Sequence, residues 1–293
     1  MAKTILITGA STGFGRDTAE TLAAAGHRVF ASMRDPKVRN REHAIALRGQ
    51  GVDVVELDVT DSQSVDAAAA AIISQTGAID VLINNAGVAA AGVSEAFTPE
   101  QTARLFDVNV IGLHRMIRAV APHMRRRNDG LIVNIGSVVG RVTLPFFGIY
   151  GASKFAVEAL SDTYRYELSQ LGIDVALVQP SAYPTQLYES AIQPSDSNRA
   201  MEYGAVGEIP AAMFQNFDSM LSGPDAPNPH EVAEVVANLI SSPKGQRPAR
   251  TVVGASFGAD AVNDAAAPIQ AKTVESLGLG HLAAMPGDLA NAA

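Results

Sequence analysis

The chain contains no cysteine. This absence excludes disulfides, sites that bind a metal through thiolates, and a cysteine nucleophile. No apolar run reaches the roughly 18 residues that a membrane-spanning helix needs, so we expect no membrane partner. The first residues enter a strand-like run at once and lack the pattern of a signal peptide. We therefore expect a cytoplasmic protein.

A surplus of basic residues is also missing. The chain has 22 lysines and arginines against 30 aspartates and glutamates, which gives a formal net charge of −8. Nucleic-acid-binding proteins usually carry a basic field, so we expect no nucleic-acid partner. The six histidines show no ligand spacing such as HExxH, and we expect no bound metal.

The chain does contain enough apolar material for a large core, with 47% hydrophobic and 18% charged residues. Strand-like apolar runs alternate with helical stretches. We expect strands at residues 4–8, 28–33, 52–57, 81–84, 131–135, 173–179 and 251–253, and the main helices at 15–25, 62–75, 99–126 and 153–171. This alternation predicts an α/β protein with a doubly wound, parallel, seven-stranded sheet and helices on both faces. No boundary divides the chain, so we expect a single domain over residues 1–293.

Two segments interrupt the alternation. Residues 186–228 form a long connection, and residues 255–293 form an Ala/Gly-rich tail after the last strand. A connection this long in a compact domain is usually functional or disordered. Residues 186–228 are rich in apolar and aromatic side chains, which fits a substrate lid over a hydrophobic pocket. A small satellite core or an oligomer contact is the alternative.

A glycine-rich loop follows the first strand and opens a helix. Glycine suits places where the chain turns sharply or where a phosphate approaches the backbone. The helix that begins here directs unpaired N–H groups and a partial positive charge toward such a phosphate. The loop therefore predicts a dinucleotide site. The residues expected to bind the cofactor are Gly9, Ser11, Thr12, Gly13, Phe14 and Gly15.

The end of the second strand indicates which dinucleotide is bound. NAD enzymes usually carry an acidic residue there, which accepts hydrogen bonds from the ribose hydroxyls. This chain has Met33, which does not repel a 2′-phosphate, followed by Arg34, which can pair with one. A surface pair between Arg34 and Asp35 is the alternative reading of the arginine. We expect NADP (NADPH) to be preferred, with NAD as the other candidate.

Several separated motifs then follow in one order. Asp58-Val59 follows the third strand, Asn84-Asn85-Ala86-Gly87 follows the fourth, and Asn109, Ser137, Tyr150 and Lys154 come later. Together with the loop at 8–15, these motifs resemble those of the short-chain dehydrogenase/reductase family in its single-domain form. The resemblance covers roughly residues 3–185 plus the last strand, and it implies a Rossmann-type sheet. The run "ASMRD" and the long lid are similar to the retinol and hydroxysteroid dehydrogenase branch.

The resemblance also implies roles for these positions. The catalytic residues would be Asn109, Ser137, Tyr150 and Lys154. Beyond the loop and Arg34, the cofactor would contact Asp58, Val59, Asn85, Ala86, Gly87, Tyr150, Lys154, Pro180 and Thr185. The family usually has glycine after the proline, whereas this chain has Ser181, which adds a Cβ where the cofactor is expected. The family's usual subunit contacts imply a homodimer or a homotetramer.

Tyr150 and Lys154 are four residues apart, so they share one face of a helix. A free tyrosine has a pKa of about 10, and a neighbouring ammonium group favours the phenolate. We expect the pKa of Tyr150 to move toward the working pH, so that it exchanges a proton with the substrate oxygen. Ser137 would donate to that oxygen as negative charge develops, or else cap a turn. By resemblance, Asn109 bends its helix and holds a water of the proton relay; a solvated helix face is the alternative.

These features predict an NADPH-dependent carbonyl reductase, formally reversible to an alcohol dehydrogenase. Its small-molecule substrate would be a bulky apolar or aromatic ketone or aldehyde. Two alternatives stay open, an NAD-dependent alcohol dehydrogenase working oxidatively and a non-catalytic NADP-binding regulator. The regulator predicts a damaged Tyr150 or Lys154, and both residues are intact.

Overall fold

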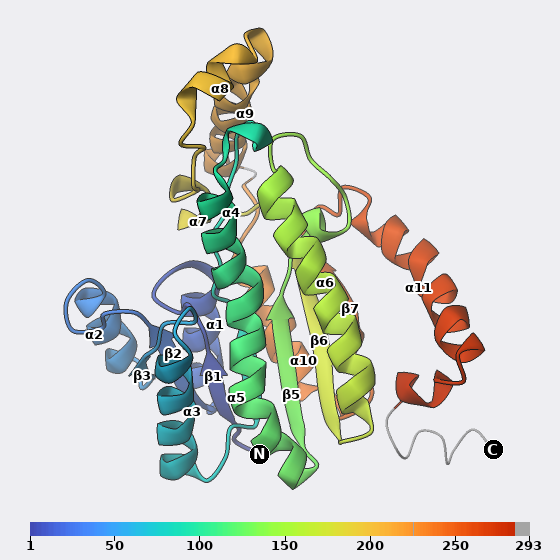
Figure 1. The fold of residues 1–293 in the computed structure, drawn as a ribbon. Helices are drawn as coiled ribbons and strands as arrows, with labels where there is room; N and C mark the ends of the chain where they lie inside the picture. The colour runs from blue at the N-terminus through green and yellow to red at the C-terminus, as the bar shows by residue number, and fades with distance from the viewer. Residues whose placement is uncertain (225, 285–293) are drawn as a thin grey trace.

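Seven parallel strands form one sheet in the computed structural model, which describes residues 1–224 and 226–284 (Figure 1). The strands are β1 (Thr4–Ile7), β2 (Arg28–Met33), β3 (Asp53–Glu56), β4 (Val81–Asn84), β5 (Gly130–Ile135), β6 (Ile173–Pro180) and β7 (Arg250–Val253). They lie in the order β3-β2-β1-β4-β5-β6-β7, and each neighbouring pair is parallel. The predicted doubly wound sheet is confirmed. Its strand order reverses between β1 and β4, where ligands of such sheets bind.

Helices cover both faces of the sheet (Figure 1). One face packs against α1 (Gly13–Ala24), α2 (Arg41–Gly49) and α10 (His230–Ser241), and the other against α3 (Ser62–Thr76), α5 (Gly112–Arg127) and α6 (Gly148–Ser169). Every residue of β5 and β6 is buried as a result. This double coverage explains why the strands read as continuous apolar runs rather than alternating ones.

The stretch expected as one helix at 99–126 is divided by a π-helical turn. Helix α4 (Pro99–Phe106) begins at a capping box, in which Thr98 and Gln101 satisfy each other's backbone N–H groups. The π turn covers Asp107–Ile111, and α5 follows it directly. A π turn adds a residue to a helix and often occurs at a functional site. Here it contains Asn109.

Helix α6 begins five residues before the start expected at residue 153. The chain turns at Phe146, whose φ of 64° is left-handed, and the helix starts at Gly148. Tyr150 therefore lies in the first turn of α6 and Lys154 in the second. The early start brings both side chains to the carboxyl edge of the sheet.

The long connection after β6 contains three helices that the sequence pattern did not predict. They are α7 (Gln186–Glu189), α8 (Ser197–Glu202) and α9 (Ala205–Ser222). Figure 1 places α8 and α9 beyond one end of the sheet, far from the N-terminus. After β7, the expected tail contains α11 (Ala259–Ser276) and a short turn at Gly280–Ala283, and residues 285–293 of the tail lie outside the described residues. Within the described ranges, no helix has both the length and the apolar character to cross a bilayer.

Candidate active site

A cleft of about 540 Å³ lies where β1, β4, β5 and β6 end. It is lined by all but one of the residues that were expected to bind a cofactor, namely Gly9, Ser11, Thr12, Gly13, Phe14, Arg34, Asp58, Val59, Asn85, Ala86, Gly87, Tyr150, Lys154, Pro180 and Thr185. Ser137 lines it too, so three of the four expected catalytic residues meet there. Residues more than 170 positions apart in the chain thus share one cavity.

The exception, Gly15, packs under the glycine-rich loop instead of lining the cleft. A Cβ at Gly15 would lie 2.6 Å from the Gly9 carbonyl oxygen and 2.4 Å from Asn85 Nδ2, which is too close for real atoms. Gly9 and Gly13 have φ values of 64° and 55°, which favour glycine. Gly15 therefore shapes the loop, which is a structural role.

The loop fits a phosphate group. Thr12 precedes α1 without capping it through its side chain, so the first N–H groups of the helix stay available to a ligand. A Cβ at Gly13 would meet only the Thr185 side chain, at 3.7 Å, so this part of the loop borders open space. The backbone donors and the cleft together suit the diphosphate of a dinucleotide.

Hydrogen bonds between β1 and β4 hold the loop in place. Asn85 Nδ2 donates to the carbonyl oxygens of Thr8 (2.9 Å) and Gly9 (3.0 Å). The Thr8 hydroxyl oxygen accepts from the backbone N–H groups of Asn85 and Ala86, both at 3.0 Å. The motif at 84–87 therefore supports the loop in addition to bordering the cleft.

The end of β2 presents a positive side chain to the cleft. Met33 is buried and Arg34 is exposed at the cleft border. Among the described residues Arg34 forms no ion pair with Asp35. Arg39 and His43 line the same region. Sequence reasoning missed both, because their position depends on the turn before α2 and on α2 itself, which was not predicted.

The Tyr150 phenol and the Lys154 ammonium group lie close together on α6. Lys154 Nζ is 5.7 Å from the centroid of the Tyr150 ring and donates a hydrogen bond of 3.0 Å to the Ile135 carbonyl oxygen. Only 4% of Tyr150 and 7% of Lys154 is exposed. Ser137, just after β5, accepts from Val139 N at 3.3 Å, so its cap interaction is present beside its place in the cleft.

The pKa of Tyr150 differs from the expectation. Burial raises the pKa of the Tyr150 phenol, the Tyr188 phenol adds to the rise, and the nearby Ser137 hydroxyl opposes it. Burial also lowers the pKa of Lys154 to about 8, against the effect of Glu158. The expected lowering of the tyrosine pKa was wrong for the protein's own residues, because desolvation by burial is the largest effect on this phenol.

Asn109 lies behind the cleft and does not line it. It is 3% exposed, and its side-chain oxygen accepts from Val88 N at 2.9 Å. Its amide group donates to the Val88 carbonyl oxygen (2.9 Å) and to Ser153 Oγ (3.0 Å). The solvated-face alternative is therefore wrong. A Cβ at Gly87 would lie 3.4 Å from Asn109 Oδ1 and 4.0 Å from Lys154 Nζ. The Asn109 side chain and the Lys154 ammonium group therefore both lie close to Gly87.

Ser181 occupies the glycine position without backbone strain. Its φ is not left-handed, and its N–H donates to the Val253 carbonyl oxygen at 2.9 Å, which continues the β6–β7 pairing. Tyr183, two residues on, is buried in the core rather than in the lid. Its hydroxyl donates to Glu231 at 2.7 Å, and its ring meets Phe14 edge-on at 5.5 Å.

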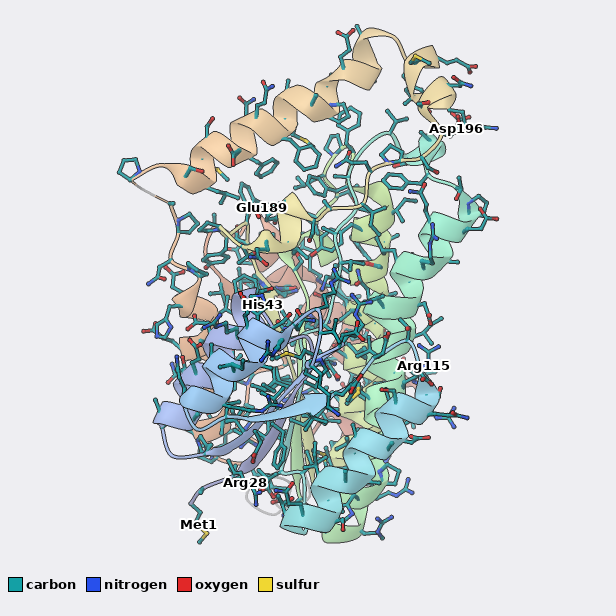
Figure 2. The ribbon with its side chains drawn as sticks, turned by 90° about the vertical axis from the view of Figure 1, so that its left-hand side faces the viewer. Met1, Arg28, His43, Arg115, Glu189 and Asp196 are labelled. Atoms are coloured by element: carbon teal, nitrogen blue, oxygen red, sulfur yellow. The ribbon has the colours of Figure 1, made fainter. Side chains whose placement is uncertain are left out.

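Aromatic side chains from the residue before α6, from α7 and from α9 pack in one cluster with Tyr150. The Phe147 ring lies 6.4 Å from Phe214 and 6.1 Å from Phe217, measured between centroids. The Tyr188 ring stacks on Phe217 at 6.2 Å. Figure 2 shows α9 lying across the end of the molecule where Glu189 marks α7 and Asp196 marks the start of α8. The segment 186–222 thus packs over one side of the cleft.

A doubly wound sheet whose glycine-rich loop opens into a cleft at its switch point defines a dinucleotide-binding α/β protein. Residues 3–195 match the model of the short chain dehydrogenase family. The chain belongs to this family of oxidoreductases, as its motifs indicated.

Comparison with individual proteins supports the predicted branch. A 3-ketodihydrosphingosine reductase of Bacteroides thetaiotaomicron is 41% identical over 181 residues, which cover 62% of this chain and 64% of the reductase. The 17-beta-hydroxysteroid dehydrogenase type 1 of Homo sapiens is 34% identical over 258 residues, covering 83% of this chain and 76% of that protein. The structure of a variant actinorhodin polyketide ketoreductase with NADPH superposes with a TM-score of 0.72 and 28% identity, covering 88% of this chain and 97% of the ketoreductase.

Proposed function

We propose that the chain is an NADPH-dependent carbonyl reductase, formally reversible to an alcohol dehydrogenase, with Tyr150 as the general acid and base. The observation that carries the proposal is the burial of a phenol and an ammonium group side by side at the cleft that also contains Ser137. An acid, a cation beside it and a hydroxyl donor are the groups that carbonyl reduction requires.

The raised pKa of Tyr150 favours the reductive direction. A phenol with a pKa above its ordinary value is neutral at neutral pH, so it is ready to give a proton to an alkoxide oxygen. Lys154, with a pKa of about 8, is mostly cationic at neutral pH and stabilises the phenolate that remains. Ser137, whose hydroxyl donates to the Pro180 carbonyl oxygen at 3.4 Å, would redirect that hydrogen bond to the same substrate oxygen. The oxidative alternative needs the phenolate at the start, which burial disfavours.

NADPH, when bound, supplies the hydride that reduces the carbonyl carbon. The loop residues Gly9 to Phe14 would hold its diphosphate, and Asp58 and Val59 its adenine end. Arg34 would pair with the 2′-phosphate, which Met33 does not repel. The NADPH in the related ketoreductase structure supports this choice.

The substrate is proposed to be a bulky apolar or aromatic ketone or aldehyde. The aromatic cluster of Phe147, Tyr188, Phe214 and Phe217 would act as a lid that covers such a molecule. The names of the relatives, a reductase of a sphingosine ketone and a steroid dehydrogenase, support large apolar substrates. The match covers 64% of the first of these proteins, so its substrate is support by analogy only.

A parallel screen of ketones and aldehydes with NADPH and with NADH, followed by absorbance of the reduced nicotinamide, tests the proposal. We expect turnover of bulky ketones with NADPH and its loss in Tyr150→Phe. Binding of NADPH without turnover of any carbonyl would support the regulator instead. Faster turnover of alcohols with NAD than of ketones with NADPH would support the oxidative enzyme.

A further inference from the structure

Tyr188 is the one residue with a hydroxyl in the aromatic cluster that it forms with Phe147, Phe214 and Phe217. It lies on α7 and lines the cleft. Its ring stacks on Phe217 with an interplanar angle of 12°, and it belongs to the same apolar cluster as Tyr150 and Phe147. The ring is thus held by α9 on one side, and the phenol borders the cleft. The sequence pattern suggested only an apolar lid residue at this position.

The Tyr188 hydroxyl has no hydrogen-bond partner among the described residues. Two other tyrosines of this region differ, because Tyr183 donates to Glu231 at 2.7 Å and Tyr203 donates to Glu95 at 2.8 Å. The fully buried side-chain atoms without a partner, among the described residues, are Ser32 Oγ and Asn84 Oδ1. The Tyr188 hydroxyl is not one of them, so it is accessible to a ligand. A half-buried phenol in the cleft wall therefore offers an unused donor and acceptor to a ligand.

The open hydroxyl is near the proposed point of chemistry. The Tyr188 phenol is close enough to Tyr150 to contribute to the raised pKa of the latter. Burial raises the pKa of Tyr188 itself to about 12, so the group is a neutral donor at neutral pH. It is not within hydrogen-bond distance of Tyr150. A molecule whose carbonyl oxygen meets Tyr150 and Ser137 can therefore present a second oxygen to Tyr188.

We infer that Tyr188 is a specificity-determining residue, whose hydroxyl binds a second oxygen of the substrate close to the reacting carbonyl. The inference rests on the proposed carbonyl reduction. It narrows the substrate class to bulky ketones that carry a further hydrogen-bonding oxygen, such as keto esters, diketones or hydroxy ketones. A site that hydrogen-bonds a substrate oxygen rejects an analogue lacking it more strongly than an apolar pocket rejects a change of size.

Tyr188→Phe tests the inference, because it removes the hydroxyl and keeps the ring that stacks on Phe217. Three aromatic ketones serve as probes with NADPH: methyl benzoylformate and ethyl benzoylacetate, which carry a second oxygen at two spacings, and propiophenone, which carries none. Comparing the variant with the wild type for each ketone cancels differences in intrinsic reactivity. We expect kcat/KM to fall about tenfold for at least one keto ester, as one lost neutral hydrogen bond implies, and to stay within about twofold for propiophenone.

Tyr203→Phe is the matched control, because it removes a lid hydroxyl that faces Glu95 outside the cleft. We expect it to change the three rates in equal proportion or not at all. Equal losses for all three ketones in Tyr188→Phe would overturn the inference and assign the residue a packing role.

A binding measurement separates this inference from the proposed function. Methyl mandelate is the alcohol that corresponds to methyl benzoylformate, and 1-phenyl-1-propanol (phenylpropanol below) is the alcohol that corresponds to propiophenone. Both alcohols are titrated calorimetrically into the NADP-loaded protein. If no ketone is reduced but Tyr188→Phe weakens methyl mandelate about tenfold more than phenylpropanol, the proposed function fails and the role of Tyr188 stands. If Tyr188→Phe changes the affinity for both alcohols by the same factor, and kcat/KM for all three ketones by the same factor, the proposed role of Tyr188 fails whichever substrate the enzyme reduces.

Discussion

Lys154 Nζ lies over the Tyr150 ring, 5.7 Å from its centroid, and both side chains are buried. The face of an aromatic ring attracts a cation at this range. The hydrogen bond from Lys154 to the Ile135 carbonyl oxygen holds the ammonium group in place. Negative charge that develops on the phenol during proton transfer therefore meets a cation that is already positioned, which lowers the cost of reorganisation.

Tyr150→Phe is expected to lower kcat for ketone reduction by about 10²- to 10⁴-fold, the range typical of losing a general acid. The affinity for NADPH should change little, because the loop donors and Arg34 are untouched. Steady-state kinetics and a fluorescence titration of NADPH measure the two effects. Tyr166→Phe, on the same helix but away from the cleft, serves as the control. Near-normal turnover in Tyr150→Phe would remove its role in proton transfer.

The stability of the ligand-free protein should depend on the protonation of Lys154. Its pKa is lowered from 10.5 to about 8, so between these pH values the unfolded chain binds more protons than the folded chain. The contribution of this group to the free energy of unfolding should therefore rise with pH across this window, by up to about 3 kcal/mol, while the tyrosines with raised pKa oppose it near their ordinary pKa of 10. No thiol titrates in the same range, because the chain lacks cysteine.

Urea denaturation of the wild type and of Lys154→Met, at several pH values across that window, measures the effect. We expect the rise to be smaller in the variant by the contribution of the lysine. Identical pH profiles for the two proteins would mean that Lys154 is not desolvated in solution.

Arg34→Ala is expected to raise KM for NADPH by about tenfold or more, since it removes a charge-assisted hydrogen bond to the 2′-phosphate. KM for NADH should hardly change, because NADH lacks that phosphate. Arg48→Ala, at the exposed end of α2 and away from the cleft, is the matched control. Met33→Asp should shift the preference further toward NADH. Equal changes for both cofactors in Arg34→Ala would assign the phosphate to another group, such as Arg39.

Phe217→Ala should raise KM for bulky aromatic ketones severalfold more than for a small ketone such as acetone, because it opens the aromatic cluster above Tyr150. Met220→Ala removes a side chain of α9 that is 46% exposed. This change should alter KM for neither kind of ketone. Parallel kinetics with propiophenone and acetone provide the comparison. A uniform loss for both ketones would indicate that Phe217 stabilises the fold rather than covers the substrate.

Ser181→Gly is expected to leave KM for NADPH unchanged, because the serine already adopts an ordinary backbone conformation and keeps its hydrogen bond to Val253. The unfolded state should gain conformational freedom, which costs about 0.4–1 kcal/mol of stability. Thermal and urea denaturation measure this loss. Markedly tighter NADPH binding in the variant would show instead that the serine side chain obstructs the cofactor.

The strands and the loop were predictable because their signals are local. The bounds of β2 and β4 agree with the expected 28–33 and 81–84, since buried parallel strands read as short apolar runs. The surroundings of Asn109 were not predictable, because its partner Val88 is 21 residues away and spacing alone does not reveal the contact. The same limit applies to Arg39 and Tyr188, whose positions depend on helices that have weak local patterns.

The electrostatics of Tyr150 were the least accessible from the sequence. The spacing to Lys154 indicated proximity correctly, and proximity of a cation favours the phenolate. Burial favours the neutral phenol, and the size of this effect depends on Phe147 and the other side chains that cover the ring. Which of the two effects on the Tyr150 pKa is larger therefore depends on the packing of the lid, and no sequence motif describes that packing.

The π turn at Asp107–Ile111 also sets the rotational phase of one helix against the next. A regular helix advances about 100° per residue, so the extra residue turns the apolar stripe of α5 relative to that of α4. The stripe of Leu113, Met116, Ile117 and Val120 then faces the sheet. Shortening this turn by one residue would make a more regular helix and rotate those four side chains about 100° away from the sheet.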